Sequence, residues 1–151
     1  MSTHTHQSAA LETALNVQVA NWTLLGMKLH HYHWYVKGPQ FFTLHEKFEE
    51  LYNEAAGYVD ELAERLLAIG GQPVSTLKQS IELSTLEEAK GGEEAKAMVA
   101  ELVKDLGIVA RELTETIPVA EEGSDQPTAD LLIGMRASIE KHMWMLNAFL
   151  G

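Results

Sequence analysis

Apolar residues recur every three or four positions over two long stretches in the first half of the chain, which is the spacing of a helix that buries one face. The first stretch ends at Gly38-Pro39, because proline interrupts a helix, and the second ends at Gly70-Gly71. Thr43 and Glu46 have the spacing of a capping box, which predicts Thr43 as the N-cap of the second helix. The predicted inward positions are Leu11, Leu15, Trp22, Leu25, Leu29, Tyr32 and Val36, followed by Leu44, Phe48, Leu51, Ala55, Val59, Leu62, Leu66 and Ile69.

The second half of the chain predicts two more long helices after a long crossover. The crossover covers residues 72–92 and contains a short predicted helix near residues 75–83. The third long helix runs from about Glu93 to Ile117, where Pro118 and an acidic turn at residues 121–125 end it, and the last begins near Pro127. Their inward positions are Met98, Leu102, Leu106, Val109 and Leu113, followed by Leu132, Met135, Ile139, His142 or Met143, Leu146 and Phe149.

Four long helices with one long middle connection predict an all-α fold, a ferritin-like four-helix bundle with a short helix in the crossover. The crossover allows the second and third long helices to run parallel. A chain of 151 residues fits a single domain over residues 1–151, with residues 1–8 as a flexible tail.

Composition excludes several kinds of site. The chain has no cysteine, which rules out disulfides, thiolate metal sites and cysteine nucleophiles. It has neither a signal-peptide pattern at Met1–Ala10 nor an apolar run of about 20 residues, so we expect a cytoplasmic protein without a membrane span. The net charge of −11 argues against non-specific nucleic-acid binding and suits a protein that attracts cations, although solubility alone also explains it.

Four potential metal ligands lie on one strip of the predicted second helix. With His45 at zero, Glu49 falls at about 40°, Asp60 at about 60° and Glu64 at about 100° around the axis. However, His45 and Asp60 are fifteen residues apart, or ~22 Å along a helix, so they cannot hold the same ion within one chain. Two antiparallel copies of this helix would bring the imidazole end of each to the carboxylate end of the other. The short turn after the first helix places His33 beside His45.

A site of imidazoles and carboxylates without sulfur favours iron(II) and tolerates zinc, manganese or cobalt. A two-fold interface would create two such sites in each dimer. The alternative is a solvated helix surface, which is the usual reason for acidic and histidine side chains on a helix. The Glu-x-x-His motif of di-iron sites inside a single bundle is absent from the sequence, so a site within one subunit is not expected.

The sequence resembles the Dps family of miniferritins, and most closely its Bacillus-like and Listeria-like members. The resemblance extends from about Asn16 to Gly151. The segments that carry it are His33-Trp34-Tyr35-Val36-Lys37-Gly38, Phe41-Phe42-Thr43-Leu44-His45-Glu46-Lys47, Asp60-Glu61-Leu62-Ala63-Glu64-Arg65, Ile69-Gly70-Gly71, Glu140-Lys141-His142-Met143-Trp144-Met145-Leu146 and Ala148-Phe149-Leu150.

The resemblance implies a hollow homo-oligomer of twelve subunits with an iron-oxidising site between two-fold-related chains. By position, His33 and His45 match the histidine ligands of one subunit, and Asp60 and Glu64 match the carboxylate ligands of the other. Glu49 stands where the family commonly has aspartate, as an auxiliary ligand. Family members oxidise iron(II), preferably with hydrogen peroxide, and store iron(III) in the cavity, which protects the cell from oxidative stress.

Further roles follow from the resemblance alone. Trp34 adjoins His33 and corresponds to an aromatic residue that can supply an electron when oxidant exceeds iron; packing at an interface is the alternative. Asp130, and less closely Asp125 and Glu121, resemble acidic residues that line iron-entry pores. The alternative for these three is a solvated acidic turn.

DNA binding is not expected, because Met1–Asn16 contains no lysine or arginine, and family members that bind DNA usually use a basic tail. Two rival functions remain open at this point. One is a DNA-binding, nucleoid-protecting shell with secondary iron chemistry. The other is a structural shell without turnover, in which the same ligands hold zinc.

Overall fold

The computed structural model describes the backbone of residues 5–151 and the side chains from residue 9 onward, so most of the predicted tail at residues 1–8 lies outside it. Over these residues the chain forms helices and no strand, which confirms the all-α class. None of the described helices is long and apolar enough to cross a membrane. The helices are α1 (Thr5–Tyr35), α2 (Phe41–Ala68), α3 (Leu77–Leu83), α4 (Ala95–Glu122) and α5 (Gln126–Leu150).

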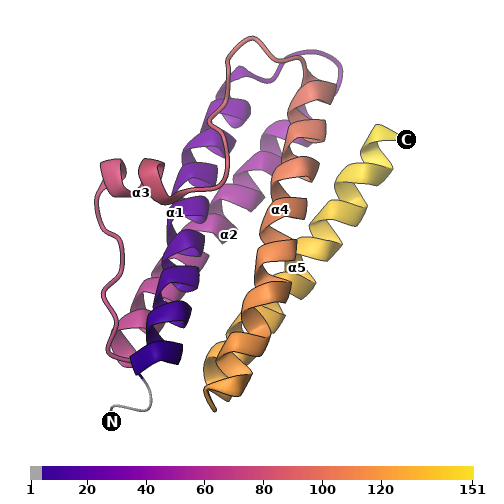
Figure 1. Cartoon of the computed structure of the whole chain (residues 1–151). Coiled ribbons are helices and arrows are strands. Elements are labelled where there is room, and N and C mark those ends of the chain that lie inside the picture. The colour runs from indigo at the N-terminus through magenta and orange to yellow at the C-terminus, as the bar shows by residue number, and fades with distance from the viewer. Residues whose placement is uncertain (1–4) are drawn as a thin grey trace.

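Two antiparallel helix pairs make up the bundle (Figure 1). Helices α1 and α2 form one pair, and α4 and α5 form the other. The crossover between them, including α3, returns along α1 to the opposite end of the bundle, so α2 and α4 run parallel as predicted. Helix α1 is therefore covered on one side by α2 and on another by the crossover.

The predicted inward positions form the core. Most of them are buried, and Val59, Ile69 and Phe149 pack against the core from partly buried positions. Where the sequence left His142 or Met143 open on the last helix, His142 is buried and Met143 only partly so. A histidine in this core needs polar partners, because burying a polar group without a hydrogen bond is costly.

The predicted N-cap at Thr43 is wrong, because Gln40 is the N-cap and α2 begins at Phe41. Gly38 turns the chain with φ of 100°, and Phe41 N–H then donates to the Gly38 carbonyl at 3.0 Å. Leu44 N–H donates to the carbonyl of Gln40 at 2.9 Å, and no side chain caps the helix. The backbone turn thus starts the helix two residues before Thr43 and satisfies the first amide of α2 without a side-chain cap.

The predicted break at Pro118 is also wrong, because α4 continues through it to Glu122. Beyond the proline, Ala120 is fully buried and extends the apolar stripe of Leu113 and Ile117. The proline deprives the Thr114 carbonyl of its donor, but both residues lie on the exposed side, where water can replace that hydrogen bond. Core burial therefore outweighs the proline.

Buried polar residues of α1 hold the crossover in place. Lys28, whose side chain is 1% exposed, lies 2.8 Å from the Asp105 carboxylate of α4 and donates to the Glu87 carbonyl at 2.7 Å. Asn21 donates to the Thr85 hydroxyl at 3.0 Å. These contacts fix the chain between α3 and α4 against α1 and supply partners for groups that would otherwise be buried unpaired.

Candidate metal centre

His33 and His45 face each other where the end of α1 meets the start of α2. Their rings stack with centroids 3.6 Å apart and planes 13° apart. Each ring is also hydrogen-bonded to the backbone of the other residue: His33 Nδ1 lies 2.6 Å from the His45 carbonyl, and His45 Nδ1 lies 2.7 Å from the His33 carbonyl. We call this arrangement the histidine brace.

The brace determines which nitrogen of each ring is free. A carbonyl oxygen can only accept a hydrogen bond, so Nδ1 of each ring must carry the proton. In the neutral imidazole, Nε2 then keeps a lone pair that is available to a metal ion. A second hydrogen bond that fixes the tautomer and orientation of a ring is the usual support of a histidine metal ligand.

Further side chains surround the brace. Phe41 stacks on His45 with ring centroids 4.9 Å apart, and Tyr52 meets His33 edge-on at 5.3 Å. Glu49 is exposed, and its Oε1 lies 3.8 Å from His33 Nε2. The structure thus brings Glu49 to the free nitrogen of His33, next to the point where a metal ion would bind.

Asp60 and Glu64 lie on the same continuous helix as His45, near its other end, as the sequence predicted. Both are exposed. Among the residues that the structure describes, no three histidine, aspartate or glutamate side chains lie close enough together to hold a metal ion. In a single chain the two imidazoles (the histidine half of the predicted site) and the two carboxylates (its carboxylate half) therefore lie at separate positions.

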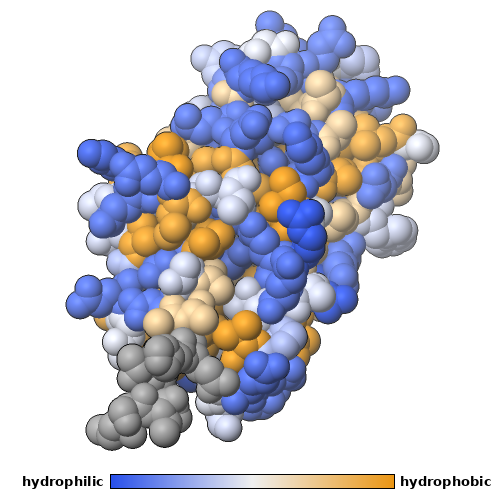
Figure 2. Space-filling view, in the orientation of Figure 1, coloured by the Kyte–Doolittle hydropathy of each residue, from blue (hydrophilic) through white to orange (hydrophobic). Residues whose placement is uncertain are grey.

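An apolar patch lies close to the histidine half. It covers α3 and the neighbouring part of α1, and Figure 2 shows apolar side chains gathered there. A groove of about 610 Å³ runs through it. Trp34, which follows His33, is 63% exposed in this patch. The patch comprises Met27, Trp34, Tyr35, Leu77 and Ile81.

The three predicted pore residues differ in their surroundings. The Asp125 side chain caps α5 by accepting from Thr128 N–H at 3.1 Å, and it pairs with Arg65 at 3.0 Å. Its burial acts to raise its pKa, but the hydrogen bonds from Thr128 and the charge of Arg65 outweigh this and lower the pKa. Glu121 and Asp130 are exposed, and Asp130 accepts a hydrogen bond from Gln126 at 2.7 Å.

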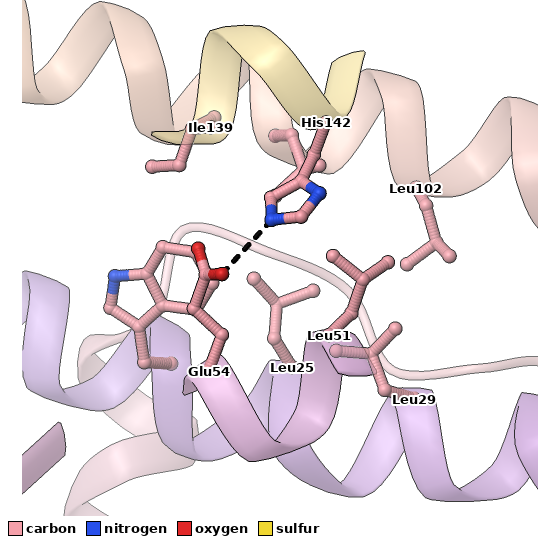
Figure 3. Close-up of a pocket in the computed structure, with 9 residues that line it drawn as sticks. Leu25, Leu29, Leu51, Glu54, Leu102, Ile139 and His142 are labelled. Carbon is pink, nitrogen blue, oxygen red and sulfur yellow. Dashed lines mark hydrogen bonds and ion pairs between the residues drawn. The ribbon is translucent and has the colours of Figure 1, made fainter. Parts of the chain in front are cut away.

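A second polar cluster, which the sequence analysis missed, crosses the middle of the bundle. Glu54 of α2 and His142 of α5 point toward each other, with 2.9 Å between Glu54 Oε1 and His142 Nε2 (Figure 3). The other Glu54 oxygen accepts from Tyr58 at 2.6 Å and from Ser138 at 2.7 Å. Lys47 lies 3.0 Å from His142 Nδ1. The signal available in the sequence was the pairing of two polar residues, Glu54 and His142, on helix faces that turn inward.

The hydrogen-bond partners of His142 determine which of its ring nitrogens carries the proton. An ammonium group can only donate, so Nδ1 accepts from Lys47, and Nε2 carries the proton that it donates to Glu54. Burial acts to raise the pKa of Glu54, but hydrogen bonds from His142, Tyr58 and Ser138 outweigh it and lower the pKa to about 2. Glu54 is therefore a carboxylate with three hydrogen-bond donors.

Comparison with known proteins places the chain in a family. Residues 12–151 match the model of the ferritin-like domain. The chain is 55% identical over 136 residues to DNA protection during starvation protein 2 of Bacillus anthracis, covering 90% of this chain and 93% of that protein.

Two crystal structures show the same likeness. A Dps protein from Bacillus brevis superposes with a TM-score of 0.95 at 51% identity, over 97% of this chain and 98% of the other. Dps from Listeria innocua, solved after soaking with zinc, gives a TM-score of 0.90 at 45% identity, over 93% and 96% of the two chains. The fold, the sequence match and the coverage agree, and the chain is a member of the Dps family of ferritin-like proteins.

Proposed function

We propose that this protein oxidises iron(II) with hydrogen peroxide at sites between two-fold-related copies and stores iron(III) in a hollow shell of twelve subunits. The histidine brace is the observation that carries the proposal. It leaves Nε2 free on two stacked rings of one chain, with Glu49 next to the Nε2 of His33. Two fixed, neutral imidazoles are a donor set suited to iron(II) or zinc.

A second copy supplies the missing ligands. His45 and Asp60 are separated by fifteen residues of one uninterrupted helix, ~22 Å, and a helix does not bend enough to close that gap. When two copies of α2 pack antiparallel, Asp60 and Glu64 of each reach the brace of the other. Because a two-fold interface is self-complementary, each dimer has two complete sites.

The apolar patch gives the second copy a surface to cover. Patches of this kind, with several large exposed side chains around a groove, commonly mark protein interfaces. Trp34 and Tyr35 lie both in this patch and next to His33 in the chain. Burial of the patch by the partner would also exclude water from the site, which strengthens the interactions of charged groups there.

Each ligand has a defined part in the reaction. The two imidazoles bind iron(II) through Nε2 while Nδ1 stays bonded to the brace, and the ionised carboxylates of Asp60 and Glu64 balance the charge of the ion. Hydrogen peroxide takes one electron from each of two iron(II) ions and two protons from water, and becomes two water molecules. Iron(III) then hydrolyses and releases protons, and no hydroxyl radical forms. Trp34 is the nearby aromatic residue that would give up an electron when iron(II) is short.

The negative charge of the subunits supports iron storage in the proposed shell. Twelve copies at −11 each carry −132 formal charges, which would concentrate cations at and within the shell. Glu121 and Asp130 are exposed carboxylates at the junction of α4 and α5, and we assign them to the iron-entry pore. Zinc and other divalent ions would compete for the oxidation site, and the cytoplasm is the expected location.

Rapid-mixing measurements of iron(II) oxidation by hydrogen peroxide test this proposal. Asp60→Asn with Glu64→Gln should abolish fast oxidation, as should His33→Ala with His45→Ala. Glu61→Gln is the matched control, since Glu61 is an exposed glutamate on the same stretch of α2. Equal rates in all four proteins would contradict the proposal and leave a shell that holds a structural metal ion.

The name of the Bacillus anthracis relative points to a second candidate, protection of DNA by direct binding. The net charge of −11 and the absence of lysine and arginine from Met1–Asn16 oppose it. Gel-shift measurements at moderate salt and neutral pH, without added metal, separate the two. We expect no retained DNA, and tight retention would favour the second candidate.

A further inference from the structure

Tyr58 makes the shortest tyrosine hydrogen bond in the described part of the chain. Its hydroxyl lies 2.6 Å from Glu54 Oε2, which is the distance of a strong hydrogen bond from a hydroxyl to a carboxylate. Glu54 is held in place by His142 and Ser138 from α5. The acceptor of the tyrosine proton is thus an ionised, immobilised carboxylate.

The other aromatic residues lack such an acceptor. Tyr32 is fully buried and lies 3.3 Å from Glu93, a longer contact, and within the described residues no partner is found for the hydroxyls of Tyr35 and Tyr52. Trp22 packs edge-on against Tyr58 with ring centroids 4.8 Å apart, but its buried Nε1 has no hydrogen-bond partner. Of these groups, only Tyr58 can pass its proton over a short hydrogen bond.

This geometry matters for oxidation. A phenol that loses an electron becomes a strong acid, so removing the electron is far easier when a base accepts the proton at the same time. Proton transfer needs a donor and an acceptor within about 2.6–3.2 Å, which Tyr58 and Glu54 satisfy.

We propose that Tyr58 is a one-electron donor that consumes oxidising equivalents when hydrogen peroxide exceeds iron(II), with Glu54 as its proton acceptor. The inference rests on the proposed function for its oxidant. Tyr58 lies two residues before Asp60 on α2 and about 200° around the helix axis from it, so its ring lies on the inward face of α2, behind the carboxylate half of the proposed site. Trp22, in contact with Tyr58, extends this aromatic group into the core.

The reaction consists of two one-electron steps. One iron(II) ion reduces hydrogen peroxide by one electron and gives iron(III), hydroxide and a hydroxyl radical. Tyr58 gives one electron, which reduces the radical to a second hydroxide, and its proton moves to Glu54. The products are iron(III), two hydroxide ions, a neutral Tyr58 radical and protonated Glu54, so a diffusible radical is exchanged for one held inside the bundle.

The first test needs no iron. The metal-free protein is photo-oxidised with tris(bipyridine)ruthenium and persulfate, and electron paramagnetic resonance records the radicals. We expect a neutral tyrosyl signal that is lost in Tyr58→Phe and retained in the matched control Tyr35→Phe. Glu54→Gln should slow its formation and remove the solvent isotope effect, whereas Ser138→Ala, which keeps the Tyr58–Glu54 hydrogen bond, should not.

The second test adds iron(II) and then excess hydrogen peroxide to the same proteins. The same tyrosyl signal should appear in the wild type and be lost in Tyr58→Phe, while iron(II) oxidation continues at the wild-type rate. Normal iron(II) oxidation with an unchanged radical in Tyr58→Phe would overturn the inference and leave the proposed function intact. If no iron(II) is oxidised, the proposed function fails, and the photochemical result alone decides whether Tyr58 and Glu54 are a redox pair.

Discussion

His33 and His45 each donate a hydrogen bond from Nδ1 to the backbone carbonyl of the other, at 2.6 and 2.7 Å, with their rings stacked at 3.6 Å. The pair closes the junction between α1 and α2 and fixes both rings with Nε2 free. One arrangement thus joins two helices and leaves Nε2 of both rings free, as the proposed metal site requires.

The brace predicts a tautomer that can be observed directly. Above pH 8, where imidazoles are neutral, nitrogen-15 spectra should show His33 and His45 protonated at Nδ1, because each Nδ1 faces a carbonyl. Addition of zinc should then shift the Nε2 resonances of both. His142 should show the opposite tautomer, with its proton at Nε2, and it serves as the internal control.

Removing one histidine of the brace should weaken metal binding without changing the tautomer of the other. In His45→Ala the His33 ring loses its stacking partner but keeps its hydrogen bond to the backbone carbonyl of residue 45, so Nδ1 should stay protonated, while loss of the second imidazole should lower zinc affinity, measured by calorimetry, by about 10–100-fold or more. His30→Ala, which removes a neighbouring histidine that stacks on Tyr52, is the comparison. A smaller loss in His45→Ala than in His30→Ala would contradict the role assigned to the brace.

The buried ion pair between Lys28 and Asp105 should be costly to break. The two side chains are 1% and 3% exposed. Lys28→Met leaves the Asp105 carboxylate buried beside Glu101 and should lower the free energy of unfolding by about 3–5 kcal/mol. Urea unfolding measures this, and the double variant Lys28→Met with Asp105→Leu should recover most of the loss, since well-packed apolar pairs replace buried ions at little cost.

The lowered pKa of Glu54 predicts that the stability of the protein depends on pH. Its hydrogen bonds lower its pKa in the folded state from 4.5 to about 2, so its stabilisation is present above pH 4.5 and is lost as pH falls toward 2. The full loss is at most about 3 kcal/mol. Thermal unfolding of Glu54→Gln between pH 6 and 2.5 should be flatter than that of the wild type. Glu140→Gln, an exposed glutamate paired with Arg136, should leave the pH profile unchanged.

Substitutions at Asp125 and Asp130 should have different effects, the first on stability and the second on iron entry. Asp125→Ala removes the cap of α5 and the partner of Arg65, and should lower the free energy of unfolding by about 1–2 kcal/mol. Asp130→Asn removes an exposed carboxylate, and should slow iron(II) uptake at low ionic strength with little change in stability. Denaturant unfolding and initial oxidation rates measure the two effects. The reverse pattern would exchange their assigned roles.

The fold could be predicted from sequence because three-and-four apolar spacing records burial directly. The stripe from Leu44 to Leu66 predicted both α2 and its buried face. Two local signals were misleading. Thr43 has the spacing of a cap, although the Gly38 turn starts the helix two residues earlier, and Pro118 suggests a helix end, although Ala120 is buried beyond it. In both places packing or backbone contacts outweighed a local preference.

The candidate site could be predicted only in part. Helix geometry placed His45 and Asp60 too far apart for one ion, and the short turn placed His33 beside His45. The brace itself could not be foreseen, because it depends on how two backbones approach each other, which residue spacing does not specify. Lys28 in α1 carried a signal that was overlooked, since a lysine among buried positions requires an acidic partner elsewhere in the fold.

Mixing two inactive variants tests the shared site most directly. One variant carries His33→Ala and His45→Ala, and the other carries Asp60→Asn and Glu64→Gln. After unfolding and joint refolding at equal amounts, random pairing restores a complete ligand set at about a quarter of the sites. We predict that iron(II) oxidation returns to about that fraction of the wild-type rate, although each variant alone is inactive. A mixture as inactive as its components, with assembly of normal size, would show that each site belongs to one chain and would contradict the account.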